Sequence, residues 1–429
     1  MKIRTCLLAT LTVAAMLTSA KAQAAPASCG FPKTSWTARA PERLGLDAAR
    51  LQDAFDFATE HRSQSVVVVR HGCLAGSSRL DALTGQQKLE GWSMTKAVTA
   101  LVVGRAVTLG KFDIDKPIGP LYPEADKAHK ALTPRQLLTM SSGLRLTWGR
   151  DFNGTELMPD RIKDALSLEF DHRPGTYWAY GQSPVSLLLN AVQRSVREDI
   201  QSWTQKHLFG PIGITRDQWT WDRDRAGNTQ GWAHLQMFPS AWARIGHLVL
   251  RNGNWNGRQL IRREYLRQAT SSSGANHAYG FFFWLNGKDS FVMASPNGYD
   301  AGKGTLVPKA PADSIIMAGQ DEQRIYIVPS LDLVVVRLGQ KGSNDPNFRI
   351  VVWTSRAGEL DNGLMLRIQR AVVDKRLEDP GDYRYANPDA PSLAPDTYPG
   401  SLYSDPIGVL AGFGVGPQAP AGCTPAGCS

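Results

Sequence analysis

The chain has 429 residues, 42% of them hydrophobic and 20% charged, which excludes a largely disordered protein and leaves ample length for a large core or two lobes. Its formal net charge is +9. No block of lysine and arginine interleaved with aromatic residues accompanies that charge, so the sequence gives no support for binding nucleic acid.

Residues 1–24 have the pattern of a secretory signal peptide. Lys2 and Arg4 precede an apolar run, Cys6–Leu17, and the small-residue stretch 22–24 is typical of a cleavage site. We therefore expect export to the periplasm or the extracellular space and a mature chain that begins near Ala25, with a formal charge reduced from +9 to +6. No later stretch has about 20 consecutive apolar residues, so no membrane span is expected after signal removal.

Hydrophobic periodicity predicts the next elements in chain order. The apolar spacing over Asp47–Arg62 is helical, and Ser65–Arg70 is a β-branched run that predicts a strand followed by a turn at 71–72. A helix is expected over about Ser93–Leu109. The stretch Thr133–Arg223 is mostly helical in pattern and is broken by glycine and proline.

Later segments predict strands, because they carry aromatic or β-branched residues bounded by Gly, Pro and Asn. These segments are Tyr279–Leu285, Arg324–Val328 and Leu333–Leu338. Early and late strands around a helical insert predict one two-lobed α/β domain over residues 40–375, with the helical lobe at about 116–230. Residues 376–429 are rich in Pro, Gly, Ala and Ser, which predicts a tail without a core of its own.

Four cysteines remain after the signal peptide. An even number in an oxidising compartment predicts disulfides, and of the three possible pairings we prefer Cys29 with Cys73 and Cys423 with Cys428. None of them has the surroundings of a catalytic thiol. The cysteines lack zinc-ligand spacing and the histidines include no His-x-x-x-His pair, so we expect neither a metal site nor a cofactor.

The most informative motif is the pair Ser93 and Lys96 near the start of the predicted helix. A spacing of three residues places both side chains on one helical face. A lysine can take the proton of a serine only if its surroundings keep it neutral, and the apolar run 97–103 predicts that this helix is buried. By itself the motif also fits two polar residues on a solvated helix. The hydrophobic context favours an activated nucleophile.

Several separated stretches, in the same order, resemble the serine β-lactamase and penicillin-recognising superfamily, especially its class C-like esterase and 6-aminohexanoate-dimer hydrolase branch. The stretch 92–96 (Trp-Ser-Met-Thr-Lys) is similar to the nucleophile motif, and 137–144 is similar to Leu-Leu-Thr-His-x-Ser-Gly-Leu. The stretch 174–182 resembles Pro-Gly-x-x-(Phe/Tyr)-x-Tyr-x-Asn, and 207–214 resembles a Pro-Leu-Gly-Met segment. With the later stretches 241–248 and 325–338, the resemblance covers about residues 44–338.

The resemblance implies an antiparallel sheet flanked by helices, a mostly helical second lobe, and the chemistry of acyl transfer. Ser93 would be the acylated nucleophile, Lys96 would assist its deprotonation, and Tyr180 would relay the proton to the leaving group. The backbone N–H groups of Ser93 and Gln320 would form the oxyanion hole, with Gly319 allowing close approach of the backbone.

The chain departs from the family pattern at several positions. Gln182 stands where an Asn is usual, so a substrate-binding amide is kept but moved by one methylene. The stretch 317–319 stands where the family has Lys-Thr-Gly or His-x-Gly. Met317 brings no charge to it, so an ion pair with a substrate carboxylate is not expected there. Arg324 could supply that cation, although an exposed strand arginine is the preferred interpretation. Met140 replaces a histidine outside the nucleophile group. Trp178 could line an apolar substrate pocket, although such tryptophans more often belong to the core.

The leading hypothesis is therefore a secreted serine hydrolase that cleaves a small ester or amide without metal or cofactor. Alternatives are a β-lactam or D-peptide hydrolase of the same fold, or a relative that binds a ligand without turnover. An α/β-hydrolase is a weaker alternative, since 91–95 only approaches Gly-x-Ser-x-Gly. The sequence does not identify the substrate or the oligomeric state.

Overall fold

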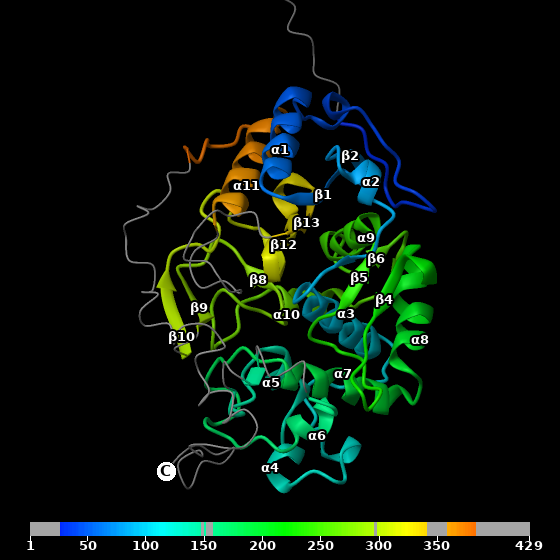
Figure 1. The fold of residues 1–429 in the computed structure, drawn as a ribbon, viewed down its shortest axis with the longest axis vertical. Helices are drawn as coiled ribbons and strands as arrows, with labels where there is room; N and C mark the ends of the chain where they lie inside the picture. The colour runs from blue at the N-terminus through cyan, green and yellow to red at the C-terminus, as the bar shows by residue number, and fades with distance from the viewer. Residues whose placement is uncertain (1–25, 147–149, 152–157, 296–297, 341–357, 383–429) are drawn as a thin grey trace, which may run out of the picture.

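The structure, a computed structural model, describes residues 26–146, 150–151, 158–295, 298–340 and 358–382. At its centre lies a six-stranded antiparallel sheet with the strand order β2-β1-β13-β12-β11-β8 (Figure 1). The sheet joins early and late parts of the chain, as predicted. Its strands are β1 (Ser63–Arg70), β2 (Cys73–Ser77), β8 (Trp284–Leu285), β11 (Ile315–Gly319), β12 (Gln323–Val328) and β13 (Leu333–Gly339).

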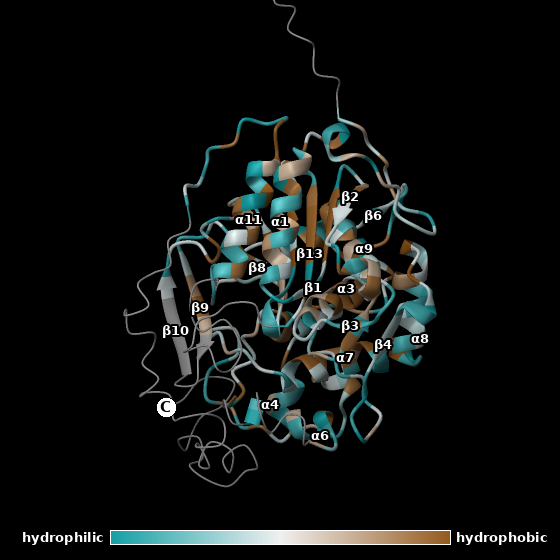
Figure 2. Ribbon diagram, turned by 45° about the horizontal axis from the view of Figure 1, so that its top comes forward, coloured by the Kyte–Doolittle hydropathy of each residue, from teal (hydrophilic) through white to brown (hydrophobic). Residues whose placement is uncertain are grey.

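Two valine-rich segments form the middle of the sheet. In β1 and β13, Val67 pairs with Val336 and Val68 pairs with Val335, and all four side chains are buried. Strands that are covered on both faces have such continuous apolar runs. Figure 2 shows these hydrophobic strands beside helices whose outer turns are hydrophilic.

Helices cover both faces of the sheet. On one face, Gly246 of α9 (Pro239–Leu250) packs against β12 and β13: a Cβ there would lie 2.8 Å from Ile325 and 2.7 Å from Val334, so a side chain would collide with both. On the other face, Asp361 of α11 (Glu359–Ala371) contacts the intervening residues of β12. Helix α1 (Ala48–Glu60) packs on α11 and β1.

Helix α3 (Met94–Thr108) lies between the sheet and the helical lobe. Residues 94–106 are all buried, and the helix packs against β11, against α7 (Ser183–Val196) and against α10 (Arg263–Ala269). A helix that is hydrophobic all round must be surrounded by protein, which explains this central position. Any charged side chain on α3 is therefore placed in the interior.

The remaining elements are short. The helical lobe contains α4 (Lys127–Lys130), α5 (Pro134–Leu138), α6 (Arg161–Ala165), α7 and α8 (Ile200–Thr204), and α2 (Asp81–Thr84) follows β2. A three-stranded sheet has the order β3-β5-β4. The small strands are β3 (Leu89–Glu90), β4 (Trp219–Trp221), β5 (Leu235–Met237), β6 (Asn254–Trp255), β7 (Arg258–Gln259), β9 (Ser290–Ser295) and β10 (Gly298–Lys303).

The structure confirms most of the predicted elements and corrects one. The helices predicted from Asp47 and from Ser93 correspond to α1 and α3, and the late strands correspond to β12 and β13. The predicted strand Tyr279–Leu285 is wrong over residues 279–283, because Phe282 has a φ of +62° and the N–H of Gly280 donates to the carbonyl of Phe283. The aromatic side chains there fill the core, which satisfies the same preference for burial without a strand.

Some predictions concern residues that the structure does not describe. The signal peptide 1–24, the tail beyond residue 382 and the Cys423–Cys428 pair lie outside the described residues. Within the described ranges, no helix is both long and apolar enough to cross a membrane.

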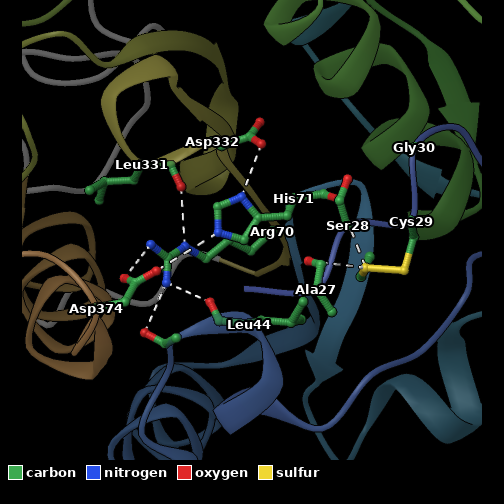
Figure 3. Close-up of polar contacts among 12 residues, drawn as sticks. Ala27, Ser28, Cys29, Gly30, Leu44, Arg70, His71, Leu331, Asp332 and Asp374 are labelled. Atoms are coloured by element: carbon green, nitrogen blue, oxygen red, sulfur yellow. Dashed lines mark hydrogen bonds and ion pairs between the residues drawn. A yellow bond between two sulfur atoms is a disulfide. The ribbon is translucent and has the colours of Figure 1, made fainter. Parts of the chain in front are cut away.

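The predicted disulfide between Cys29 and Cys73 is present and holds the N-terminal segment to the start of β2. Figure 3 shows it beside a second attachment, in which the buried guanidinium of Arg70 donates to the carbonyls of Leu44 (2.6 Å) and Leu331 (3.1 Å) and to Asp374 (2.7 Å). These contacts join segments from both ends of the described chain to the end of β1.

Replacement of both Cys29 and Cys73 by serine should lower the free energy of unfolding by about 2–4 kcal/mol, because the disulfide closes a loop of 44 residues in the unfolded chain. Urea denaturation of the oxidised protein and the double variant measures the difference. Reduced wild type should match the variant, and equal stability of oxidised and reduced wild type would contradict the expectation.

Candidate active site

Ser93 and Lys96 lie together at the start of α3. Ser93 is the N-cap residue and is half-buried, whereas Lys96 is 1% exposed. The Lys96 Nζ lies 2.9 Å from the Ser93 Oγ and 2.9 Å from the carbonyl oxygen of Trp232. The amine can therefore donate to the carbonyl while its lone pair faces the serine hydroxyl, which is the arrangement a general base needs.

The surroundings of Lys96 favour its neutral form. Burial lowers the pKa of the Lys96 ammonium well below its ordinary value of 10.5, and the negative charge of Asp151 opposes part of this shift. The amine lies 4.8 Å from the ring centre of Tyr180 and 5.6 Å from that of Trp232. Such ring contacts favour a cation by about 1–2 kcal/mol, less than complete removal from water costs it, so desolvation decides the direction.

Tyr180 lies beside the same pair and forms a side-chain hydrogen bond with Ser93. Burial raises the pKa of Tyr180 above its ordinary value of 10.0, and the hydrogen bond with Ser93 opposes that shift only in part. The phenol therefore stays protonated at neutral pH and can donate a proton. Its ring lies among the buried rings of Trp178, Tyr279 and Trp284, with centre distances of 5.9, 6.4 and 6.3 Å, which hold it in place.

Gln182, two residues further on, is the N-cap residue of α7 and is 3% exposed. Its amide oxygen has no hydrogen-bond partner among the described residues. A buried acceptor without a hydrogen bond lowers the stability of the fold unless a ligand or a water molecule donates to it. Gln182 thus remains a candidate for binding substrate, while the Lys96 amine is hydrogen-bonded to Ser93 and to the carbonyl of Trp232.

The end of β11 lies directly against the chain that leads to Ser93. A Cβ on Gly319 would be 2.2 Å from the carbonyl oxygen of Gly91, so only glycine fits. Gln320 follows at the start of a 3₁₀ turn, Gln320–Glu322. Strand β11 therefore brings the predicted residues Gly319 and Gln320 beside the nucleophile segment.

Two carboxylates around this site, Glu90 and Asp151, were not predicted from the sequence. Glu90 in β3 accepts hydrogen bonds from the backbone N–H of Trp92 (2.8 Å) and of His234 (3.0 Å). Trp92 and His234 have φ values of +46° and +63°, which are uncommon for residues other than glycine. One carboxylate thus holds the residue before Ser93 and the segment whose Trp232 carbonyl binds Lys96.

Asp151 is the second such residue. It is 1% exposed, and its charge acts on Lys96. The preceding Arg150 pairs with Asp164, which also accepts a hydrogen bond from Ser183 of α7 at 2.8 Å. Neither a motif nor a spacing in the sequence indicated that this carboxylate would face Lys96.

A family model described as beta-lactamase matches residues 50–353, more than two thirds of the chain. The chain belongs to the beta-lactamase family. The fold agrees with this assignment, because the antiparallel sheet flanked by helices and the mostly helical lobe are those that the sequence resemblance implied. The α/β-hydrolase alternative is wrong, because that fold is built on a mostly parallel sheet.

Solved structures of the beta-lactamase fold resemble this chain at low identity. One assigned as a 6-aminohexanoate-dimer hydrolase from Bacillus anthracis has a TM-score of 0.55 and 15% identity, with 74% of this chain and 83% of that chain covered. A family VIII carboxylesterase has a TM-score of 0.54 and 14% identity, with 75% and 97% covered. A D-alanine carboxypeptidase from Burkholderia cenocepacia has a TM-score of 0.51 and 16% identity, with 76% and 99% covered. Among curated proteins, none matches the chain.

The structure shows where the residues that depart from the family pattern lie, and all three of those described below are buried. Met317 is fully buried in β11. The interpretation of Arg324 as an exposed strand residue is wrong, since its side chain is 5% exposed and pairs with Asp361 at 2.9 Å. Its charge is used inside the protein. Met140 is also buried, and its carbonyl accepts a hydrogen bond from Ala179, next to Tyr180.

The lowered pKa of Lys96 predicts a pH dependence of stability. Between that lowered pKa and 10.5, the unfolded chain binds a proton at Lys96 that the folded protein does not, so the free energy of unfolding should rise with pH over this window. Denaturant titrations of wild type and Lys96→Met measure it. The wild-type curve should rise more steeply, and parallel curves would show that Lys96 is charged when folded.

Loss of the Glu90 carboxylate should weaken the site. We expect Glu90→Ala to lower the free energy of unfolding by about 1–3 kcal/mol, because two backbone donors lose a charged acceptor. Glu90→Gln keeps an acceptor oxygen and should lose less. Chemical denaturation of both variants provides the measurement, and an Ala variant as stable as wild type would show that the two N–H groups do not depend on this carboxylate.

Proposed function

We propose that this member of the beta-lactamase family is an exported serine hydrolase that cleaves a small ester or amide through an acyl-enzyme on Ser93. The observation that supports the proposal most strongly is the buried amine of Lys96, 2.9 Å from the Ser93 Oγ. Burial of a lysine is costly, and a lysine whose pKa is lowered beside a hydroxyl is typical of a catalytic base.

The proposed reaction has two halves. The Ser93 Oγ attacks the carbonyl carbon of the substrate while its proton passes to the Lys96 Nζ, and the N–H groups of Ser93 and Gln320 stabilise the oxyanion. Tyr180 donates its proton to the leaving alkoxide or amine and regains one from Lys96. Water then attacks the acyl-enzyme, releases the acid and restores the Ser93 hydroxyl.

The charges around the site favour an uncharged substrate. Met317 offers no cation, and the guanidinium of Arg324 is already paired with Asp361 and with two carbonyls. A substrate carboxylate, as in β-lactams and D-alanyl peptides, gains nothing from either residue. The Trp178 and Tyr279 rings next to Tyr180 are buried and add no charge either.

Export is supported by the N-terminal sequence and by the Cys29–Cys73 disulfide, since such bonds persist in oxidising compartments. A ligand-binding relative without turnover is the second candidate. The unpartnered amide oxygen of Gln182 would suit either of them.

A fluorophosphonate probe with intact-mass detection tests the nucleophile. Wild type should gain one adduct, and Ser93→Ala should gain none and lose at least about 10³-fold in turnover of a short-chain ester. Lys96→Met should react far more slowly than wild type.

Ser290→Ala is the matched control. Ser290 lies 3.1 Å from the Nδ1 of His277, which is also 3.3 Å from Asp289, so these residues mimic a triad on the surface. Both partners contact the same ring nitrogen, which prevents the relay that a triad needs. Ser290→Ala should label like wild type. Labelling that survives Ser93→Ala would refute the assigned site, and labelling without turnover would favour the binding relative.

A further inference from the structure

The connection between β11 and β12 has an unusual backbone. In the turn Gln320–Glu322, the consecutive residues Asp321 and Glu322 have φ values of +56° and +60°. Neither is glycine, so each position costs about 1 kcal/mol or more and persists only where the surroundings impose it. The proposed oxyanion donor, the N–H of Gln320, belongs to this turn.

Arg324 contacts the turn from the next strand. Its Nη1 donates to the carbonyl of Gly319 at 2.8 Å and to that of Gln323 at 2.9 Å, and its Nε and Nη2 donate to the two oxygens of Asp361 at 2.9 and 3.1 Å. The carboxylate of Asp361 on α11 balances the charge and fixes the guanidinium. Tyr326 is also hydrogen-bonded to Asp361.

Arg337 of β13 contacts the rest of the turn. Its Nη1 donates to the carbonyls of Asp321 at 2.7 Å and Glu322 at 3.2 Å, and its Nε donates to the Ser63 hydroxyl at 2.8 Å. Arg337 pairs directly with Arg324 across the β12–β13 ladder, and both side chains are buried. Like charges opposite one another destabilise a sheet, so the hydrogen bonds of the two guanidinium groups to the turn must offset that cost.

The contact with Gly319 has a geometric consequence for Gln320. The carbonyl of Gly319 and the N–H of Gln320 belong to one peptide unit, and no peptide bond among the described residues is cis. In a planar trans peptide the C=O and N–H point in opposite directions. A guanidinium that holds the carbonyl therefore also sets the direction of the N–H.

We propose that Arg324, supported by Arg337, is a positioning residue that aims the Gln320 N–H at the oxyanion formed on the Ser93 adduct. This inference rests on the proposed function, because it assumes that Gln320 is an oxyanion donor. Gly319 also contributes, because its backbone lies close to the carbonyl oxygen of Gly91 and so keeps the turn beside the nucleophile segment.

Arg70 provides a matched control. Like Arg324, it is a buried strand arginine that binds a carboxylate, Asp374, and several backbone carbonyls (Figure 3). Its carbonyl partners are in other segments, at Leu44, Gly45 and Leu331. Arg70→Lys and Arg324→Lys therefore remove comparable clamps, and only one of them holds the proposed oxyanion turn.

The test compares wild type, Arg324→Lys, Arg337→Lys and Arg70→Lys in two measurements. In ester hydrolysis, Arg324→Lys should lower kcat by about tenfold to a hundredfold with KM within about twofold, since a misplaced oxyanion donor weakens transition-state stabilisation alone. In amide hydrogen exchange, its 319–323 segment should exchange at least about tenfold faster than in wild type. Arg337→Lys should show both effects more weakly, and Arg70→Lys should show neither.

The two measurements separate the possible failures. Unchanged kcat in a folded Arg324→Lys, or an equal loss in Arg70→Lys, would overturn the positioning role while leaving Ser93 as the nucleophile. If amide hydrogen exchange of residues 319–323 in Arg324→Lys equalled that of wild type, Arg324 would not hold the turn in place. A wild type that neither labels nor turns over would overturn the proposed function, and with it this inference.

Discussion

The removal of the Lys96 amine from water is the constraint on which the site depends. Helix α3 is apolar around its whole circumference, and it can be stable only between the sheet and the helical lobe. A lysine on that helix is buried, so desolvation lowers the pKa of its ammonium and favours a neutral amine 2.9 Å from the Ser93 Oγ. The packing of the core and the proposed reactivity of the site thus have one cause.

Around that amine, the backbone is held in place by charged side chains, most of them buried. Glu90 binds the amides of two residues at positive φ, and Arg324 and Arg337 bind carbonyls of the β11–β12 turn. Arg244 binds carbonyls of the N-terminal segment in the same manner. Charged groups hold such carbonyls and amides more strongly than neutral ones do, which suits a site whose donors must not move.

The sequence predicted those features that depend on neighbouring residues in the chain. The valine-rich β1 and β13 and the apolar α3 were visible as periodic patterns, and Ser93, Lys96, Tyr180 and Gln182 were found through motifs. Residues that act through long-range contacts left no such signal. Glu90 meets His234 across 144 positions, and Arg324 meets Asp361 across 37, so neither pairing could be inferred from spacing. The prediction of a strand over residues 279–283 was wrong because burial and strand formation favour the same aromatic residues.

The protonation state of Lys96 is the central claim, and NMR of the protein labelled with ¹⁵N or ¹³C at its lysine side chains measures it most directly. One lysine signal, absent from Lys96→Met, should titrate well below 10.5, because burial lowers the pKa of the Lys96 ammonium. If every lysine signal, Lys96 included, titrated near 10.5, the amine would be a cation at neutral pH and could not serve as the base for Ser93.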